Sequence, residues 1–265
     1  MKFLVAKAWS AAQRTTLAGS VGWKSLVAGT VVLISVYLLK RMYSQAGAED
    51  LQWILAPSCW LVSTLGGIEL ASGSGAGFIS HQHRMVVGPA CAGVNFFIAA
   101  ILALYLSFQG TFVTLRRKIA WLLQCLCVAY LATILSNGCR ILFAAHLYGL
   151  DIYGGWLTPE RLHRLAGTLI YCASLFALCA VVSRWLTPAT ARAERNGLWS
   201  TRAIPVACYL GVAVGVPLLN RAYQQQPGRF VEHCVMVILV CGLVATLTTL
   251  ARVAADRLCS GAKHG

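Results

Sequence analysis

Three residues on successive apolar segments are of types that together can carry out thiol acyl transfer. Cys91 lies in GPACAGVNFF, Arg140 in LSNGCRILFAAH and His163 in ERLHRLAGTLIY. A thiolate is a nucleophile that a nearby cation favours, and an imidazole can take the thiol proton and later protonate a leaving amine. Arginine stays charged and cannot be a base. Arg140 is therefore expected to stabilise an oxyanion or to hold the substrate carbonyl.

Small and polar residues beside these three fit the same chemistry. Asn137 precedes Arg140 by three residues, so a helix places both on one face, where Asn137 can orient the guanidinium. Gly93 follows Cys91 by two residues and would let a peptide backbone approach the thiol. Gly167 follows His163 by four residues and leaves room on the same helix face.

Each of the three residues also has a purely structural interpretation. The chain has 11 cysteines, most of them in apolar segments, and as a group they are typical of small buried hydrophobic residues. A histidine at a helix start is often interfacial, and Arg140 can extend its charge to the head groups. An arginine inside a membrane is costly unless it is paired or faces water. The convergence of all three residues is what indicates a site.

The composition indicates the element that must position these residues, which is a membrane-spanning helix. Hydrophobic residues make up 58% of the 265 residues, charged residues only 11%, and the mean hydropathy is +0.69; a soluble domain carries about 25% charged residues. The apolar segments lack the alternation of a barrel strand. We therefore predict an all-α, polytopic transmembrane helical bundle in the lipid bilayer. The net charge of +14 reports orientation here and does not indicate a nucleic-acid partner.

Seven apolar segments are long enough, or nearly so, for the roughly 20 residues that cross a bilayer. They are 23–39, 51–69, 91–113, 120–147, 163–187, 203–219 and 233–250. The fourth is long enough to tilt or to project from the membrane. An eighth, weak segment within residues 1–20 would reconcile the N-terminal charges with the orientation, which gives about seven to eight spans. The expected organisation is an amphipathic or interfacial segment (1–22), a transmembrane domain (23–250, motif core 85–187) and a basic cytoplasmic tail (251–265).

Basic residues predict which connections are cytoplasmic. They cluster after the third span, after the fifth span and in the tail: Arg116, Arg117, Lys118; Arg184, Arg192, Arg195, Arg202; Arg252, Arg257, Lys263. All three clusters can be cytoplasmic at once, which leaves the links 148–162 and 220–232 outside. Cys91, Arg140 and His163 then lie near the outer surface, with Arg140 about 10 Å below the end of its helix.

The three motifs resemble the signature blocks of the exosortase/archaeosortase family of multi-pass membrane cysteine transpeptidases and proteases. P-A-C-A-G at 89–93, N-G-C-R-I at 137–141 and H-R-L-A-G at 163–167 agree with the family pattern in order, spacing and membrane side. The resemblance covers about residues 85–187. The residue after the cysteine is Ala92, where many members have Ser. The flanking regions carry no family motif, so the subtype and the recognition motif stay open.

The resemblance implies Cys91 as the nucleophile that forms an acyl-thioester, His163 as general acid and base, and Arg140 as the stabiliser of oxyanion or substrate. The partners it implies are secreted proteins whose C-terminal sorting tail has a short motif, one transmembrane helix and a basic cluster. Cleavage would occur at the outer face of a bacterial or archaeal cell membrane, which is the inner membrane in a Gram-negative cell. No cofactor and no metal are expected.

Two other functions stay open on the sequence. A transporter component would suit glycine-rich spans and an intramembrane arginine, although no internal repeat is evident. A haem- or metal-binding membrane protein would use His146 and His163, or the H-x-H pair His81 and His83. A visible absorption spectrum of the purified protein separates haem binding from the other functions.

Overall fold

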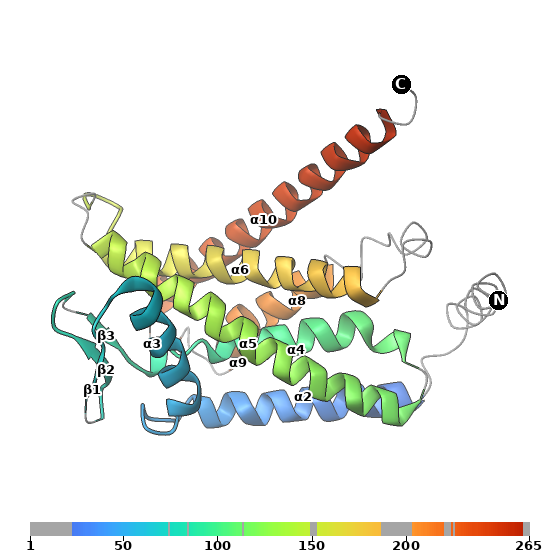
Figure 1. Cartoon of the computed structure of the whole chain (residues 1–265), viewed down its shortest axis with the longest axis horizontal. Coiled ribbons are helices and arrows are strands. Elements are labelled where there is room, and N and C mark those ends of the chain that lie inside the picture. The colour runs from blue at the N-terminus through green and yellow to red at the C-terminus, as the bar shows by residue number, and fades with distance from the viewer. Residues whose placement is uncertain are drawn as a thin grey trace. The chain divides into compact units, whose positions relative to one another are not determined.

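The computed structural model describes residues 23–73, 75–83, 85–112, 114–148, 153–186, 203–219, 224 and 226–261 (Figure 1). The predicted N-terminal segment 1–22 lies outside these residues. The chain divides into two compact units at Leu38. This boundary falls within helix α2 (Trp23–Tyr43). The first unit is helical over its described residues, and the second, from Leu39 onward, contains every predicted site residue.

Helices make up most of the second unit, in agreement with the predicted all-α class. They are α3 (Gln52–Gly66), α4 (Val94–Phe108), α5 (Leu115–Tyr148), α6 (Pro159–Leu186), α8 (Ile204–Leu210), α9 (Val216–Leu219) and α10 (Pro227–Gly261). Helix α4 is central: it packs against α5, α6 and α8, and 12 of its 15 residues are buried. Helix α3 packs on α5, and α10 packs on α6.

A small antiparallel sheet between α3 and α4 was not predicted. Its strands β1 (Ala71–Gly73), β2 (Gly77–Ser80) and β3 (Met85–Val87) pair in the order β1-β2-β3, with Ser72 opposite Phe78 and Ile79 opposite Val86. Gly77 has a φ of +101°, and a Cβ there would collide with the Val87 carbonyl oxygen. Only glycine therefore fits this position, and β3 leads directly to the turn that holds Cys91.

Five helices among the described residues are long and apolar enough to cross a membrane, so the predicted count of seven to eight spans is not confirmed. The five segments are Leu26–Tyr43, Pro89–Thr111, Leu115–Tyr148, Pro159–Leu186 and Pro227–Ala251. Helix α3 has only 15 residues, with Pro57 inside it. The predicted segment 203–219 forms a shorter apolar helix, Ile204–Leu219, in which Gly211–Gly215 adopt a π-helical turn. Both are shorter than the roughly 20 residues that a span requires.

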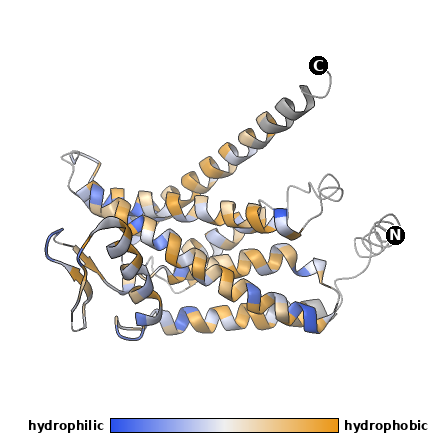
Figure 2. Cartoon of the chain, in the orientation of Figure 1, coloured by the Kyte–Doolittle hydropathy of each residue, from blue (hydrophilic) through white to orange (hydrophobic). Residues whose placement is uncertain are grey.

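The surfaces of the long helices suit a lipid environment. Helices α4, α5 and α6 and the coloured part of α10 are mostly hydrophobic, with hydrophilic residues toward the ends of α5 and α6 (Figure 2). Leu131 on α5 and Leu239 on α10 are 60% and 67% exposed. Large exposed apolar side chains on several helices mark surfaces that meet lipid or another protein. We conclude that this is a membrane protein.

Helices α5 and α10 extend furthest beyond the segments predicted for them. Helix α5 begins at Leu115, so the basic residues Arg116–Lys118 lie in its first turn and not in a connecting loop. Its 34 residues span about 51 Å, against roughly 30 Å for the hydrocarbon core. The long fourth helix was expected to tilt or project, and this length agrees with that. Helix α10 continues to Gly261, so most of the segment predicted as a tail extends this helix.

Candidate active site

Cys91 ends a short 3₁₀ turn, Pro89–Cys91, between strand β3 and helix α4. The third predicted span, 91–113, therefore becomes α-helical only at Val94, three residues after the cysteine. Gly93 makes the junction with a φ of +76°, and a Cβ there would lie 3.1 Å from Thr133 Cγ2 and 3.2 Å from the Tyr171 hydroxyl. A left-handed conformation and close neighbours both favour glycine. The Cys91 side chain is half-buried.

Asn137 fixes the backbone of Cys91. It is fully buried on α5, and its Nδ2 donates a hydrogen bond of 2.8 Å to the Cys91 carbonyl oxygen. Its Oδ1 accepts a hydrogen bond of 2.7 Å from the Tyr171 hydroxyl and a longer one of 3.5 Å from Arg140 Nη1. The side chain that was expected to orient Arg140 thus also joins α5 to the cysteine turn and to α6.

Arg140 connects the network to His163. Its Nη1 donates to the Tyr171 hydroxyl at 3.1 Å, and its Nη2 lies 2.7 Å from His163 Nε2. Gly167 makes room for this arrangement because a Cβ at that position would lie 2.8 Å from Arg140 Nε. The space that the sequence predicted beside His163 is occupied by the arginine side chain.

The hydrogen bond between Arg140 and His163 specifies the tautomer of the imidazole. Guanidinium is a donor only, so Nε2 must accept, and the ring proton of the neutral imidazole is on Nδ1. Among the described residues, Nδ1 is buried without a hydrogen-bond partner. The basic nitrogen of His163 therefore faces Arg140, and no described hydrogen bond joins His163 to Cys91.

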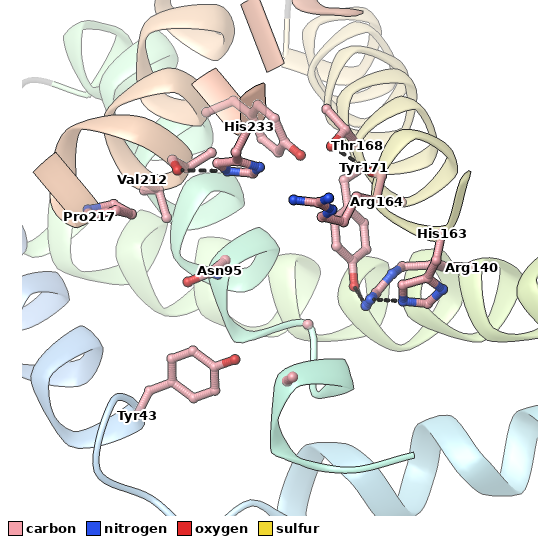
Figure 3. A pocket seen from close by; sticks show the side chains of 15 residues that line it. Tyr43, Asn95, Arg140, His163, Arg164, Thr168, Tyr171, Val212, Pro217 and His233 are labelled. Atoms are coloured by element: carbon pink, nitrogen blue, oxygen red, sulfur yellow. Dashed lines mark hydrogen bonds between the residues drawn. The ribbon is translucent and has the colours of Figure 1, made fainter. Parts of the chain in front are cut away.

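A cavity of about 240 Å³ lies beside the network (Figure 3). It is lined by Tyr43, Ala90, Gly93, Asn95, Arg140, His163, Arg164, Gly167, Thr168, Tyr171, Tyr209, Val212, Ala213, Pro217 and His233. Cys91 does not line the cavity itself, but its neighbours Ala90 and Gly93 do. A substrate in the cavity would therefore contact Arg140 and His163 directly and would meet the cysteine turn at one edge.

All six predicted site residues lie in this one region. Sequence reasoning missed Tyr171, which is buried, stacks on Phe96 with ring centroids 5.1 Å apart and bonds both Asn137 and Arg140. The spacing could have indicated Tyr171. It follows His163 by eight residues and Gly167 by four, so a helix places all three on one face.

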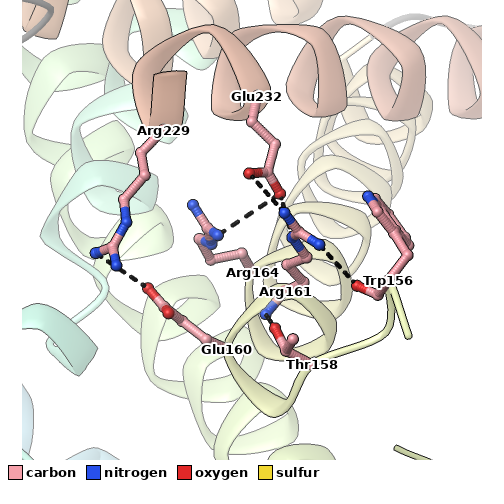
Figure 4. Close-up of polar contacts among 7 residues, drawn as sticks. All are labelled: Trp156, Thr158, Glu160, Arg161, Arg164, Arg229 and Glu232. Carbon is pink, nitrogen blue, oxygen red and sulfur yellow. Dashed lines mark hydrogen bonds and ion pairs between the residues drawn. The ribbon is translucent and has the colours of Figure 1, made fainter. Parts of the chain in front are cut away.

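Ion pairs join the first two turns of α6 to those of α10 (Figure 4). Arg161 Nε lies 2.7 Å from Glu232 Oε1, Arg164 Nη2 lies 3.8 Å from the same oxygen, and Arg229 lies 4.0 Å from Glu160. The N-terminal ends of these two helices therefore lie at one end of the bundle. The charge pattern predicted that they share a side of the membrane.

The histidines proposed for haem or metal ligation lie apart from any ligand cluster. No group of three or more His, Cys, Asp or Glu side chains within the described ranges can hold a metal ion. His146 is exposed on α5, whereas His163 is half-buried against Arg140. His83 lies beside Ser80 at the end of the small sheet, with Nδ1 3.5 Å from Oγ.

Comparison of the chain with protein-family models, with curated proteins and with solved structures found no match.

Proposed function

We propose that the protein is a membrane-embedded cysteine peptidase or transpeptidase of the exosortase type. Its substrates are secreted proteins with a C-terminal sorting tail, and cleavage occurs at the outer face of a prokaryotic cell membrane. One observation carries the proposal: a continuous network from the Cys91 carbonyl through Asn137, Tyr171 and Arg140 to His163. A structural cysteine needs no such network around it.

The reaction proceeds in two acyl transfers. Cys91 Sγ attacks the carbonyl carbon of the scissile peptide bond and gives its proton to His163 Nε2. The C–N bond breaks, the leaving nitrogen takes that proton, and an acyl-thioester remains on Cys91. Water or an amine then attacks the thioester, the C–S bond breaks, and the sulfur regains a proton.

Arg140 has two roles in this mechanism. At rest it donates to the same His163 nitrogen that must accept the thiol proton. When the substrate carbonyl arrives, the guanidinium transfers its hydrogen bond to that oxygen and stabilises the charge that develops on it. The transfer frees His163 Nε2, so that substrate binding and activation of the base are one event.

The test is to follow the C-terminal peptides of exported proteins by mass spectrometry in host cells that produce the wild type or Cys91→Ala. Wild-type cells should yield tail-bearing proteins truncated before their transmembrane helix, and Cys91→Ala cells should retain the full tails. Cys139→Ala is the matched control because Cys139 is an exposed thiol one residue from Arg140. Equal processing by wild type and Cys91→Ala would exclude this function.

A further inference from the structure

Part of the cavity wall has no role in the proposed acyl transfer. It is formed by α6, α10 and the Ile204–Leu219 segment, and it presents Arg164, His233 and Ala213. Figure 3 shows the Arg164 guanidinium and the His233 ring turned toward the same space. His233 Nε2 lies 3.2 Å from the Ala213 carbonyl oxygen, which holds the ring in this position.

The cavity has an excess of positive charge. Arg140 and Arg164 both line it, and Lys40 Nζ donates to Asn95, another lining residue. None of the lining residues that the structure describes is Asp or Glu. Among the described residues, Arg140 donates to neutral groups on Asn137, Tyr171 and His163.

The carboxylate nearest to Arg164 is already engaged. Glu232 accepts both Nε and Nη2 of Arg161, at 2.7 and 3.4 Å, while Arg164 approaches it only to 3.8 Å. Among the described residues, Arg164 Nε is buried and has no hydrogen-bond partner. Buried donors are nearly always satisfied, and Glu232 reaches only Nη2 of the partly exposed Arg164 side chain, so Nε still lacks an acceptor. An anion in the cavity would supply the acceptor that Arg164 Nε lacks among the described residues.

The size and place of the cavity favour a phosphate group. At about 240 Å³ it has room for more than a carboxylate. Arg164 and His233 lie within the first two turns of α6 and α10, at the end of the helices, where bilayer head groups are found. The guanidinium fork also matches the oxygens of phosphate. We propose that this cavity binds a phosphate-type oxyanion through Arg164, with Arg140 at its edge, and that a lipid head group or free phosphate supplies it.

The purified full chain in neutral detergent tests this proposal. Binding and thermal stabilisation are measured with phosphatidylglycerol, phosphatidylcholine, inorganic phosphate and an acidic peptide. We expect phosphatidylglycerol or phosphate to bind and raise the unfolding midpoint. Arg164→Gln should weaken that binding by about ten- to a hundredfold, as expected for loss of a charge-assisted hydrogen bond. Arg229→Gln is the control because its side chain is 64% exposed and does not line the cavity.

The result with each ligand leads to a defined conclusion. Binding of phosphatidylglycerol alone assigns a lipid head group, and binding of inorganic phosphate assigns a soluble source. Equal binding by wild type and Arg164→Gln overturns the proposal, and so does binding of the acidic peptide alone. Phosphatidylcholine carries the same phosphate, so its binding supports the proposal when Arg164→Gln weakens it. Cys91→Ala should bind like the wild type, so this result is independent of whether tails are cleaved.

Discussion

At the scale of single residues, Tyr171 and Gly167 explain how Arg140 is held. The Tyr171 hydroxyl donates to Asn137 and accepts from Arg140, so one oxygen joins the residue that fixes Cys91 to the residue that contacts His163. Gly167 leaves the space that the guanidinium occupies. Neither residue needs to touch substrate in the proposed mechanism; both set the position of Arg140, which is proposed to do so.

Replacement of Tyr171 by Phe should impair tail processing without loss of the folded protein. The change removes two hydrogen bonds of about 1 kcal/mol each, which corresponds to a rate loss of about thirtyfold if both serve the transition state. Processing per molecule of membrane-inserted protein is the measurement. Tyr153→Phe is the control because that hydroxyl bonds only the Leu147 carbonyl within the described residues. Similar rates for the two variants would remove Tyr171 from the site.

Replacement of Gly167 by Ala should displace Arg140, since the added Cβ would lie 2.8 Å from its Nε. Tail processing should fall at least tenfold, a loss that corresponds to about 1.4 kcal/mol in the transition state. Gly242→Ala on α10 is the matched control, because its Cβ would meet nothing within 4 Å. If Gly167→Ala retains full activity, the position of Arg140 is not limiting.

At the scale of elements, the charged cluster between α6 and α10 positions the helix that carries His163 and Arg164. Glu232 on α10 contacts both Arg161 and Arg164 on α6. Its side chain is 30% exposed, so the pairs are only partly screened by solvent.

We expect Glu232→Gln to lower the free energy of unfolding by up to about 1 kcal/mol, near the upper end for partly exposed pairs. Glu160→Gln should change it by no more than a few tenths, because the Glu160–Arg229 contact is 4.0 Å and both side chains are 64% exposed. Thermal unfolding of the two variants in one detergent compares them directly. A larger effect of Glu160→Gln would mean that the cluster is not organised around Glu232.

The sequence could predict the helices, but it could not predict the short strands or the direction of individual side chains. Hydropathy located every described helix of the core, and charge bias brought Cys91, Arg140 and His163 to one end, because both depend on local composition. The three short strands between α3 and α4 have three or four residues each, too few for a periodic signal. The direction of His163 Nε2 toward Arg140 depends on side-chain packing, which no spacing encodes. The same is true of the Tyr171 hydrogen bonds.

At the scale of the whole molecule, the orientation in the membrane decides whether a secreted tail can reach the site. Helix α5 carries its basic residues in its first turn and Arg140 near its other end. We therefore expect the first turn of α5 to face the cytoplasm and Arg140 to face outward.

Reporter fusions test this orientation. An enzyme that is active only outside the cytoplasm should be active when fused after Gly154 and silent when fused after Lys118. The expression level of each fusion, measured by an antibody to the reporter, is the control. The reverse pattern would place Cys91 on the cytoplasmic side, where no exported tail is presented, and the proposed function would fail.

The contact between Arg140 and His163 has a consequence for chemical probes of this protein. While the arginine occupies the lone pair of the imidazole, His163 cannot take the Cys91 proton, so reagents whose reaction depends on this base should label the resting protein slowly. A reagent that also carries a carbonyl able to accept the guanidinium would release the histidine as it binds. Selective covalent inhibitors for this site should therefore be designed around recognition of the arginine, with reactivity toward sulfur kept low.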